Sequence, residues 1–392
     1  MINRLKGKKE KCWIERSVAI QFNIVTEKPG DAGPSLAPSR ELETRSAARY
    51  GAADFALPAA AAELIEEAIP ENTAVAYRSR WRSFSAWCAD AGRVALPATA
   101  QTVAAYLTYL AVDRGLKATT VDAHLAAIRT VHRASGEVPP DGLAARKIVV
   151  AAQRREARRD GRYGPRRALP VMASDLPLIV AACTASGEEG GTAAGLRDRA
   201  VVLLGFALLA RRSELAALNI SDVEHAPEQG LEVTIRSSKT DQAAHGMVRR
   251  IHYAADTSVC PVRAVLAWLD YLADRDVRGG PLFTRIDRWG NTDSRAGGRY
   301  RSGEARDGRL RPQAIGDIIA AACEAAGLGD RDTRRYSGHS VRRGGATSML
   351  RAGAPPLNVS RHGRWADGSR SFAGYVEEAT GFGDGNPTKG LL

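Results

Sequence analysis

A strongly basic segment near the middle of the chain, residues 139–170, constrains the fold most, because it separates two regions of different pattern. It holds nine Lys or Arg residues and three acidic ones. The basic residues are Arg146, Lys147, Arg154, Arg155, Arg158, Arg159, Arg162, Arg166 and Arg167. The first part of the segment is expected to be helical, whereas Gly161, Gly164 and Pro165 make its end a linker. The 392 residues are therefore predicted to form two domains joined by this basic linker.

The region before the linker predicts a small all-α domain over residues 61–138. Apolar residues recur at helical spacing in two stripes, Val103, Tyr106, Leu107 and Leu110, then Val121, Leu125, Ile128 and Val131. An earlier helix carries the aromatic residues Tyr77, Trp81, Phe84 and Trp87, with Arg78, Arg80 and Arg82 between them. We interpret the aromatics as core and these arginines as candidate DNA contacts. Residues 1–60 show no sustained apolar period and are expected to be a poorly ordered leader.

The region after the linker, residues 171–380, predicts a mainly helical domain with a small antiparallel sheet. A buried helix is expected over residues 198–210, and Ser213 is expected to cap the next helix. Residues 231–235 alternate as a strand, and residues 248–253 are expected to be the hairpin partner. Residues 286–309 form an Arg- and Gly-rich insertion without a predicted structure, and residues 381–392 form a short flexible tail.

The charge of the chain favours a polyanionic partner. It has 56 Lys and Arg against 44 Asp and Glu, a net charge of +12, and a pI near 9.7. Basic side chains displace counterions from phosphates, so double-stranded DNA fits such a surface, and the basic linker suits a path along its phosphates. A solubility charge or a preference for anionic membranes would give the same balance.

Cysteine usage and hydropathy indicate a soluble, cytoplasmic protein. The cysteines are odd in number and scattered, at Cys12, Cys88, Cys183, Cys260 and Cys323, which indicates neither a disulfide framework nor a zinc site. They are interpreted as small buried hydrophobes in a reducing compartment. No unbroken apolar stretch follows the basic N-terminus, so no signal peptide is expected. The longest apolar run, residues 200–210, is far shorter than the ~20 residues that a bilayer needs.

Five local patterns in the second region carry candidate chemistry. In chain order they contain Arg211 with Glu214, Lys239, His339 with Arg342, Trp365, and Tyr375. Each has an ordinary explanation when taken alone. Arg-x-x-Glu on a helix is commonly a surface ion pair, a hairpin lysine is usually exposed, His-x-x-Arg occurs by chance, and a tyrosine near the C-terminus usually packs.

The order and spacing of these patterns resemble the tyrosine recombinases of the phage integrase family, whose signature is Arg, Lys, His-x-x-Arg, His or Trp, then Tyr. The resemblance covers about residues 70–380, and residues 73–132 resemble the core-binding domain of this family. Trp at position 365, where other members have His, is typical of the Cre-like members. The resemblance implies a SAM-like four-helix DNA-binding domain followed by a catalytic domain of the DNA breaking-rejoining enzyme fold.

The resemblance also implies a reaction. Tyr375 would attack a phosphodiester and form a 3′-phosphotyrosyl link, and Arg211 and Arg342 would hold the phosphate oxygens in forked hydrogen bonds. Such preorganised charge is worth about 3–4 kcal/mol per donor by analogy with oxyanion holes. His339 would donate a further hydrogen bond or assist proton transfer, and Lys239 would protonate the leaving 5′-oxygen. Trp365 would bind the same phosphate or pack beneath it.

The resemblance gives Glu214 a supporting role and implies no cofactor and no metal. Candidate DNA contacts are Arg78, Arg80, Arg82, Arg154, Arg155, Arg158, Arg159 and Arg162. Because two DNA sites offer four strands, the active form would be a homo-tetramer on DNA, with a monomer or weak oligomer when free. Accessory proteins are compatible with this expectation, and the biological role of the recombination stays open.

Two features depart from the family pattern. Trp365 and Tyr375 are separated by one residue more than in Cre-like members, which implies an insertion near Gly368. Arg212 stands where the family usually has an apolar residue. Rival functions are a type IB topoisomerase, which relaxes DNA without a preferred sequence, and a non-catalytic DNA-binding regulator of the same fold. A metal-dependent nuclease lacks a convincing carboxylate cluster.

Overall fold

The computed structural model describes residues 71–160, 168–184, 192–236, 246–287, 289–292, 307–329 and 335–381, and a few single positions after them. The chain divides into two units, residues 1–164 and 165–392, and the division falls inside the expected linker. The leader 1–60, most of the insertion 286–309 and most of the tail 381–392 lie outside the described residues.

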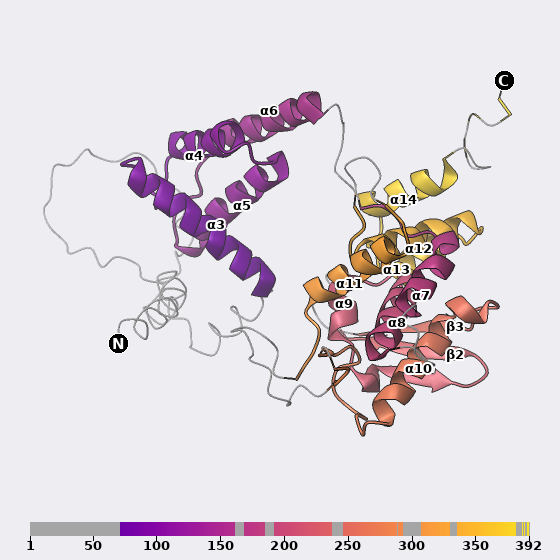
Figure 1. Cartoon of the computed structure of the whole chain (residues 1–392). Coiled ribbons are helices and arrows are strands. Elements are labelled where there is room, and N and C mark those ends of the chain that lie inside the picture. Colours follow the sequence, from indigo (N-terminus) through magenta and orange to yellow (C-terminus); the bar gives the residue numbers. More distant parts are fainter. Residues whose placement is uncertain are drawn as a thin grey trace, which may run out of the picture. The chain divides into compact units, whose positions relative to one another are not determined.

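The first unit is all-α, as the sequence predicts. Its elements are α3 (Glu71–Asp90), α4 (Ala100–Thr108), the π-helical turn η2 (Tyr109–Asp113), α5 (Ala118–Ala134) and α6 (Leu143–Asp160) (Figure 1). The aromatic residues form its core: Phe84 and Tyr106 are fully buried, and their ring centroids lie 5.0 Å apart. The interpretation as core residues is therefore confirmed for Trp81 and Phe84, and Trp87 packs against this core half-buried. Tyr77 is half-buried and lies outside the core cluster.

Helix α6 belongs to this unit although its sequence lies in the expected basic linker. Ala145, Val149 and Ala152 form a buried stripe that packs on α4 and α5. Oε2 of Glu156 also accepts a hydrogen bond from the backbone N–H of Ala118, 3.2 Å away, at the start of α5. Because Lys117 gives α5 no side-chain cap, this carboxylate from α6 takes that place.

The second unit is mainly helical. Its elements are η3 (Ala173–Asp175), α7 (Leu176–Thr184), α8 (Ala193–Ala207), α9 (Arg212–Ala217), η4 (Ile220–Asp222), β1 (Val223–Ala226), β2 (Gly230–Ile235), β3 (Met247–His252), η5 (Thr257–Val259), α10 (Pro261–Ala273), α11 (Pro312–Ala325), α12 (Ser340–Arg351), α13 (Pro356–Gly363) and α14 (Arg370–Thr380). The expected hairpin is confirmed as β2 and β3, and β1 extends it to an antiparallel sheet of order β1-β2-β3. Among the described residues no helix is long and apolar enough to cross a bilayer.

Helix α8 lies at the centre of this unit, in contact with α7, α9, α10, α11 and α12. Two adjacent glycines allow α12 to pack closely. A Cβ atom on Gly344 would lie 1.6 Å from the carbonyl oxygen of Val171, and one on Gly345 would lie 2.6 Å from that of Phe206. The backbone of α12 therefore rests directly on the segment before α7 and on the last turn of α8.

Replacing Gly344 with alanine is expected to destabilise the second unit by about 2 kcal/mol or more, because the atom in the way is backbone and cannot rotate aside. The matched control is Gly316→Ala in α11, where the new Cβ meets nothing closer than 3.5 Å. That change is expected to be neutral or stabilising by up to ~1 kcal/mol, since alanine favours helix. Thermal unfolding followed by circular dichroism compares the two, and equal midpoints would contradict the close packing.

Candidate active site

The site is built around the C-terminal end of α8, which stops in a Schellman motif. The Leu209 N–H donates to the Phe206 carbonyl (3.3 Å) and the Ala210 N–H to the Gly205 carbonyl (3.0 Å). Leu209 adopts a left-handed conformation with φ 50°, which costs a non-glycine residue roughly 1–2 kcal/mol. Its side chain is fully buried beside Tyr375 and Val359, and this burial offsets the backbone cost.

Arg211 follows immediately as the N-cap residue of α9. Its backbone N–H donates to Oε2 of Glu214 (2.8 Å), and its Nη1 forms an ion pair with Oε1 of the same carboxylate (2.6 Å). The Glu214 side chain is 2% exposed and the Arg211 side chain 19%. The Arg211 guanidinium is therefore bound to a buried carboxylate while part of its side chain remains accessible to solvent.

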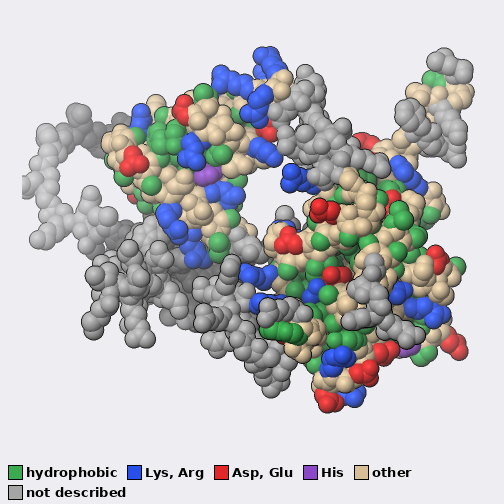
Figure 2. Space-filling model, in the orientation of Figure 1, with side chains coloured by type: hydrophobic (Ala, Val, Ile, Leu, Met, Phe, Trp, Pro, Cys, Tyr) green, Lys and Arg blue, Asp and Glu red, His purple; other side chains and the backbone are tan. Residues whose placement is uncertain are grey.

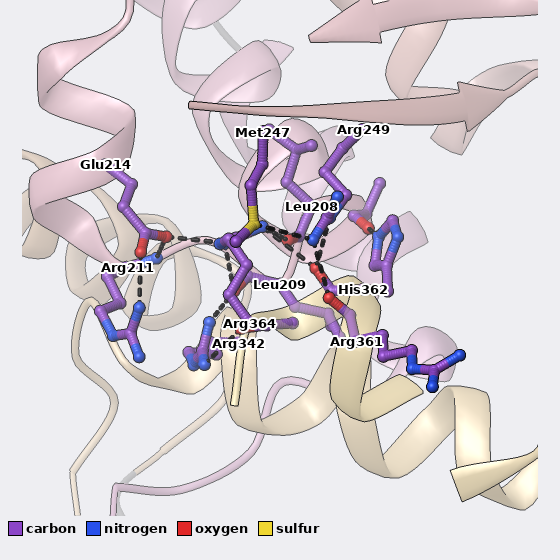
Figure 3. A network of polar contacts seen from close by, with 12 residues as sticks. Leu208, Leu209, Arg211, Glu214, Met247, Arg249, Arg342, Arg361, His362 and Arg364 are labelled. Atoms are coloured by element: carbon purple, nitrogen blue, oxygen red, sulfur yellow. Dashed lines mark hydrogen bonds and ion pairs between the residues drawn. The ribbon is translucent and has the colours of Figure 1, made fainter. Parts of the chain in front are cut away.

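A second arginine, Arg364, holds the other side of Glu214. It follows α13 in a left-handed conformation (φ 61°), and its Nη2 lies 2.7 Å from Oε2 of Glu214. Both side chains of this pair are almost completely buried. Arg364 also donates to the carbonyls of Leu208 and Leu209, each at 3.3 Å, as Figure 3 shows. The sequence analysis did not identify this residue.

Arg342 lies in the first turn of α12 and is 1% exposed. It donates through Nη1 to the Leu209 carbonyl and through Nη2 to the Gly363 carbonyl (2.7 Å). Its guanidinium lies over the Trp365 ring, 3.9 Å from the centroid, a cation–π geometry. Burial, and then the charge of Arg211, lower the Arg342 pKa to about 9. Arg211 and Arg342 point to the same side of the network (Figure 3).

Trp365 and Tyr375 complete the cluster. The Trp365 ring meets the Tyr375 ring edge-on at 5.5 Å, and Tyr375 on α14 is 5% exposed. The Tyr375 hydroxyl lies 2.9 Å from Nε2 of His339, the N-cap residue of α12. Gly363 makes room for Trp365, because a Cβ there would lie 1.8 Å from the ring. Thus Arg211, Glu214, His339, Arg342, Trp365 and Tyr375 come together in one place.

Helix α14, which carries the candidate nucleophile Tyr375, is held against α12 by an ion pair. Arg343 of α12 forms an ion pair with Glu378 of α14 (2.6 Å) and donates to the Ala168 carbonyl. The Arg343 side chain is buried, whereas the Glu378 side chain is 26% exposed. Three residues apart on α14, Tyr375 and Glu378 are therefore both attached to the start of α12. The sequence analysis did not identify Arg343 or Glu378.

The structure accommodates both the extra residue near Gly368 and Arg212 at its usually apolar position. Gly368 lies in the turn before α14 with φ 70°, and nothing lies within 4 Å of a Cβ built on it. Arg212 is exposed and donates to Oε1 of Gln313 on α11 at 2.9 Å. Its aliphatic part packs on Gly338, so the chain replaces an apolar contact with the stem of an arginine.

Other predicted site residues lie elsewhere. Lys239 and Arg162 fall outside the described residues. The remaining candidate DNA contacts lie on α3 and α6, and among them Arg78, Arg82, Arg154, Arg155, Arg158 and Arg159 are exposed. Figure 2 shows Lys and Arg side chains in blue gathered over α6, at the top of the first unit. They belong to the first unit, whereas the cluster around Arg211 belongs to the second.

Comparisons with known proteins agree with this fold. Residues 172–380 match the model of the phage integrase family, and residues 62–135 match its N-terminal SAM-like domain. An integrase/recombinase XerD homolog from Selenomonas ruminantium is 32% identical over 82% of this chain and 85% of its own length. The Cre recombinase of Escherichia phage P1 is 26% identical over 77% of this chain and 82% of its own length.

A structural comparison adds a solved relative of the same fold. The lambda integrase tetramer bound to a Holliday junction is similar with a TM-score of 0.51 and 14% identity, covering 81% of this chain and 76% of that one. At this identity the similarity concerns the fold alone. It agrees with the predicted class, a helical N-terminal domain followed by a mainly helical domain with a small antiparallel sheet.

Replacing Glu214 with glutamine is expected to destabilise the second unit by about 3 kcal/mol or more, because it leaves the buried Arg211 and Arg364 without a counter-charge. The matched control is Glu232→Gln on β2, whose partner Arg250 is 71% exposed; this change is expected to cost less than ~1 kcal/mol. Urea unfolding measures both. A Glu214 variant as stable as the control would show that the buried charges need no carboxylate.

His339 is expected to be neutral at pH 7. Although His339 is exposed as a residue, its ring is partly desolvated where Nε2 meets the Tyr375 hydroxyl. This desolvation, followed by the charges of Arg342, Arg211 and Arg343, lowers its pKa from 6.5 to about 4. Because the unfolded state binds this proton more readily, the contribution of His339 to stability is present above pH 6.5 and is lost as the pH falls toward 4. NMR titration of the imidazole, assigned with His339→Gln, tests this; a ring that titrates near 6.5 would refute it.

Proposed function

The chain belongs to the phage integrase family and is a tyrosine site-specific recombinase that cuts and rejoins DNA, and we propose that Tyr375 is its nucleophile. The observation that carries the proposal is the contact between the Tyr375 hydroxyl and Nε2 of His339, beside Arg342 and Arg211. A phenol ordinarily loses its proton near pH 10, so attack at neutral pH needs a nearby base and positive charge. Both are present around this hydroxyl.

Arg211 and Arg342 bind the non-bridging oxygens of the scissile phosphate in this proposal. Their guanidinium groups are fixed before substrate arrives, Arg211 by Glu214 and Arg342 by two backbone carbonyls. Charge placed in advance costs no reorganisation when the transition state forms, which is the main source of its catalytic effect. The Trp365 ring packs against the face of the Arg342 guanidinium and supports its orientation.

His339 handles the proton of the nucleophile. A neutral imidazole leaves a lone pair on Nε2 that accepts the hydrogen bond of the Tyr375 hydroxyl. When a phosphate enters, its negative charge raises the pKa of this ring, so the proton of Tyr375 passes to His339 as the oxygen attacks phosphorus. The bond from phosphorus to the 5′-oxygen breaks, and Lys239, by family resemblance, protonates that oxygen.

DNA is the partner of this chain, and we assign its backbone contacts to the basic faces of α3 and α6 and to the linker. The exposed arginines of α6 fit sequence-independent contacts with phosphates. A homo-tetramer on two DNA sites follows from the need to exchange four strands in pairs. We place the reaction in the cytoplasm, on nucleoid DNA.

Two alternatives predict other behaviour. A type IB topoisomerase would relax any supercoiled plasmid without site choice. A non-catalytic regulator of the same fold would bind DNA and form no covalent product. The assembled cluster of Arg211, His339, Arg342 and Tyr375 supports a catalytic site over a regulator.

A nicked suicide substrate built from DNA that flanks the gene tests the nucleophile. Wild-type protein is expected to form a protein–DNA adduct that survives SDS without magnesium, and Tyr375→Phe is expected to form none. Because the hydroxyl alone is removed from a buried ring, the variant should fold and bind DNA as before.

Tyr253→Phe is the matched control, because it also removes one hydroxyl, here bonded to His225 away from the cluster. It should form the adduct at the wild-type rate. An adduct that persists in Tyr375→Phe would place the nucleophile elsewhere. Plasmid relaxation at equal rates on unrelated sequences would favour the topoisomerase.

A further inference from the structure

We propose that Arg364 is a positioning residue, which fixes Glu214 and through it the guanidinium of Arg211 for binding of the scissile phosphate. This inference rests on the proposed function, since it concerns how the phosphate clamp of that site is held in place. Its basis is a continuous chain of contacts from Arg364 to Glu214 to Arg211, all within the second unit.

The first step is the geometry around Glu214. Its two oxygens divide their work: Oε1 accepts from Arg211 Nη1, whereas Oε2 accepts from both the Arg211 backbone N–H and Arg364 Nη2. Arg211 thus holds one oxygen through its side chain and the other through its backbone. Arg364 adds a charged hydrogen bond at Oε2, which further restricts rotation of the carboxylate and so the direction in which the Arg211 guanidinium is held.

The second step is charge. Arg211, Arg342 and Arg364 gather around one carboxylate, and the side chains of Arg364 and Glu214 are only 1% and 2% exposed. Burial raises the pKa of Glu214, but the charge of Arg364, followed by the hydrogen bond and charge of Arg211, lowers it overall. Arg364 thus keeps Glu214 ionised, and an ionised Glu214 is what orients Arg211.

The third step is the position of Arg364 relative to Arg342. Arg364 donates to the Leu209 carbonyl, the same oxygen that accepts from Arg342 Nη1. It also precedes Trp365, whose ring supports the Arg342 guanidinium. Figure 3 shows Arg364 between Glu214 and Leu209, with the two clamp arginines beyond them. One buried side chain therefore contacts the supports of Arg211 and Arg342, the two arginines of the proposed phosphate clamp.

The left-handed backbone at position 364 strengthens this interpretation. A φ of 61° is unfavourable for any side chain, and glycine would be the default residue after α13. The strain is maintained because the guanidinium is bound by Glu214 and by the backbone carbonyls of Leu208, Leu209 and His362. A strained backbone that is retained by the bonds of its side chain indicates that the side chain has a function at that position.

The experiment separates DNA binding from cleavage. Single-turnover cleavage of the suicide substrate at saturating protein is compared with the Kd for the same DNA. The proteins are the wild type, Glu214→Gln, Arg364→Lys, Arg364→Met and Glu214→Gln/Arg364→Met. Arg364→Met is expected to slow cleavage by about 10²-fold, the effect of a misplacement near 1 Å, and to change Kd less than about threefold. Arg364→Lys keeps the charge beside Glu214 and should recover most of the rate.

Non-additivity of the cleavage rates of the Arg364 and Glu214 variants distinguishes a positioning role from a merely structural one. If Arg364 acts through Glu214, Arg364→Met should add less than about threefold to the loss already caused by Glu214→Gln. Additive losses would overturn the proposal, because Arg364 would then act independently of Glu214.

The matched control is Arg197→Met at the other end of α8. Arg197 is also buried and bonded to a carboxylate and a backbone carbonyl, so this variant should lose stability and keep its cleavage rate.

The outcomes are distinguishable. If Arg364→Met does not fold, the double variant decides, because it removes both buried charges together. A double variant that binds DNA and cleaves at the wild-type rate, or more than about threefold slower than Glu214→Gln, overturns the inference. Cleavage at the Glu214→Gln rate with unchanged Kd supports it. A wild-type protein that forms no adduct would contradict the proposed function itself, whereas an active wild type with an equally active Arg364→Met contradicts the inference alone.

Discussion

The candidate site depends on one buried carboxylate, Glu214, which lies among guanidinium groups that would otherwise repel one another. Three arginines, Arg211, Arg342 and Arg364, approach it from three different elements of the second unit. Their combined charge exceeds that of Glu214, so the site is left positive before any substrate enters. In the proposed reaction a phosphodiester supplies the missing negative charge. The excess of positive charge destabilises the protein without DNA and favours binding of a phosphate. Such a loss of stability is common at functional sites.

The end of α8 is the second condition for this arrangement. The left-handed turn at Leu209 directs one carbonyl oxygen toward Arg342 and Arg364, while the Leu209 side chain packs beside Tyr375. The same turn places Arg211 at the start of α9. The proposed clamp and the proposed nucleophile thus meet at Leu209, although Arg211 and Tyr375 lie far apart in the sequence.

Much of this was accessible from the sequence. Order and spacing of the short motifs identified the family, and alternation of apolar residues predicted the β2–β3 hairpin. Strand β1 was missed because its four residues show no apolar alternation. Helix α6 was assigned to the linker because its arginines obscure a stripe made of small residues, Ala145 and Ala152 with Val149. Arg364 could not be found, since its partner Glu214 lies 150 positions earlier and nothing local marks the pair.

The glycine pair of α12 has a consequence for how such a site can change over time. Gly344 brings the backbone of α12 against the Val171 backbone, and Gly345 brings it against the Phe206 carbonyl and the Leu209 side chain. The distance from α12 to the end of α8 is therefore set by main-chain atoms and by Leu209 itself. Apolar side chains elsewhere in the core vary in size from one sequence to another, and their replacement shifts helices that rest on them. Here the spacing between the first turn of α12 and the Leu209 carbonyl does not depend on those side chains. Sequences can therefore diverge throughout the surrounding core while the phosphate-binding geometry stays constant.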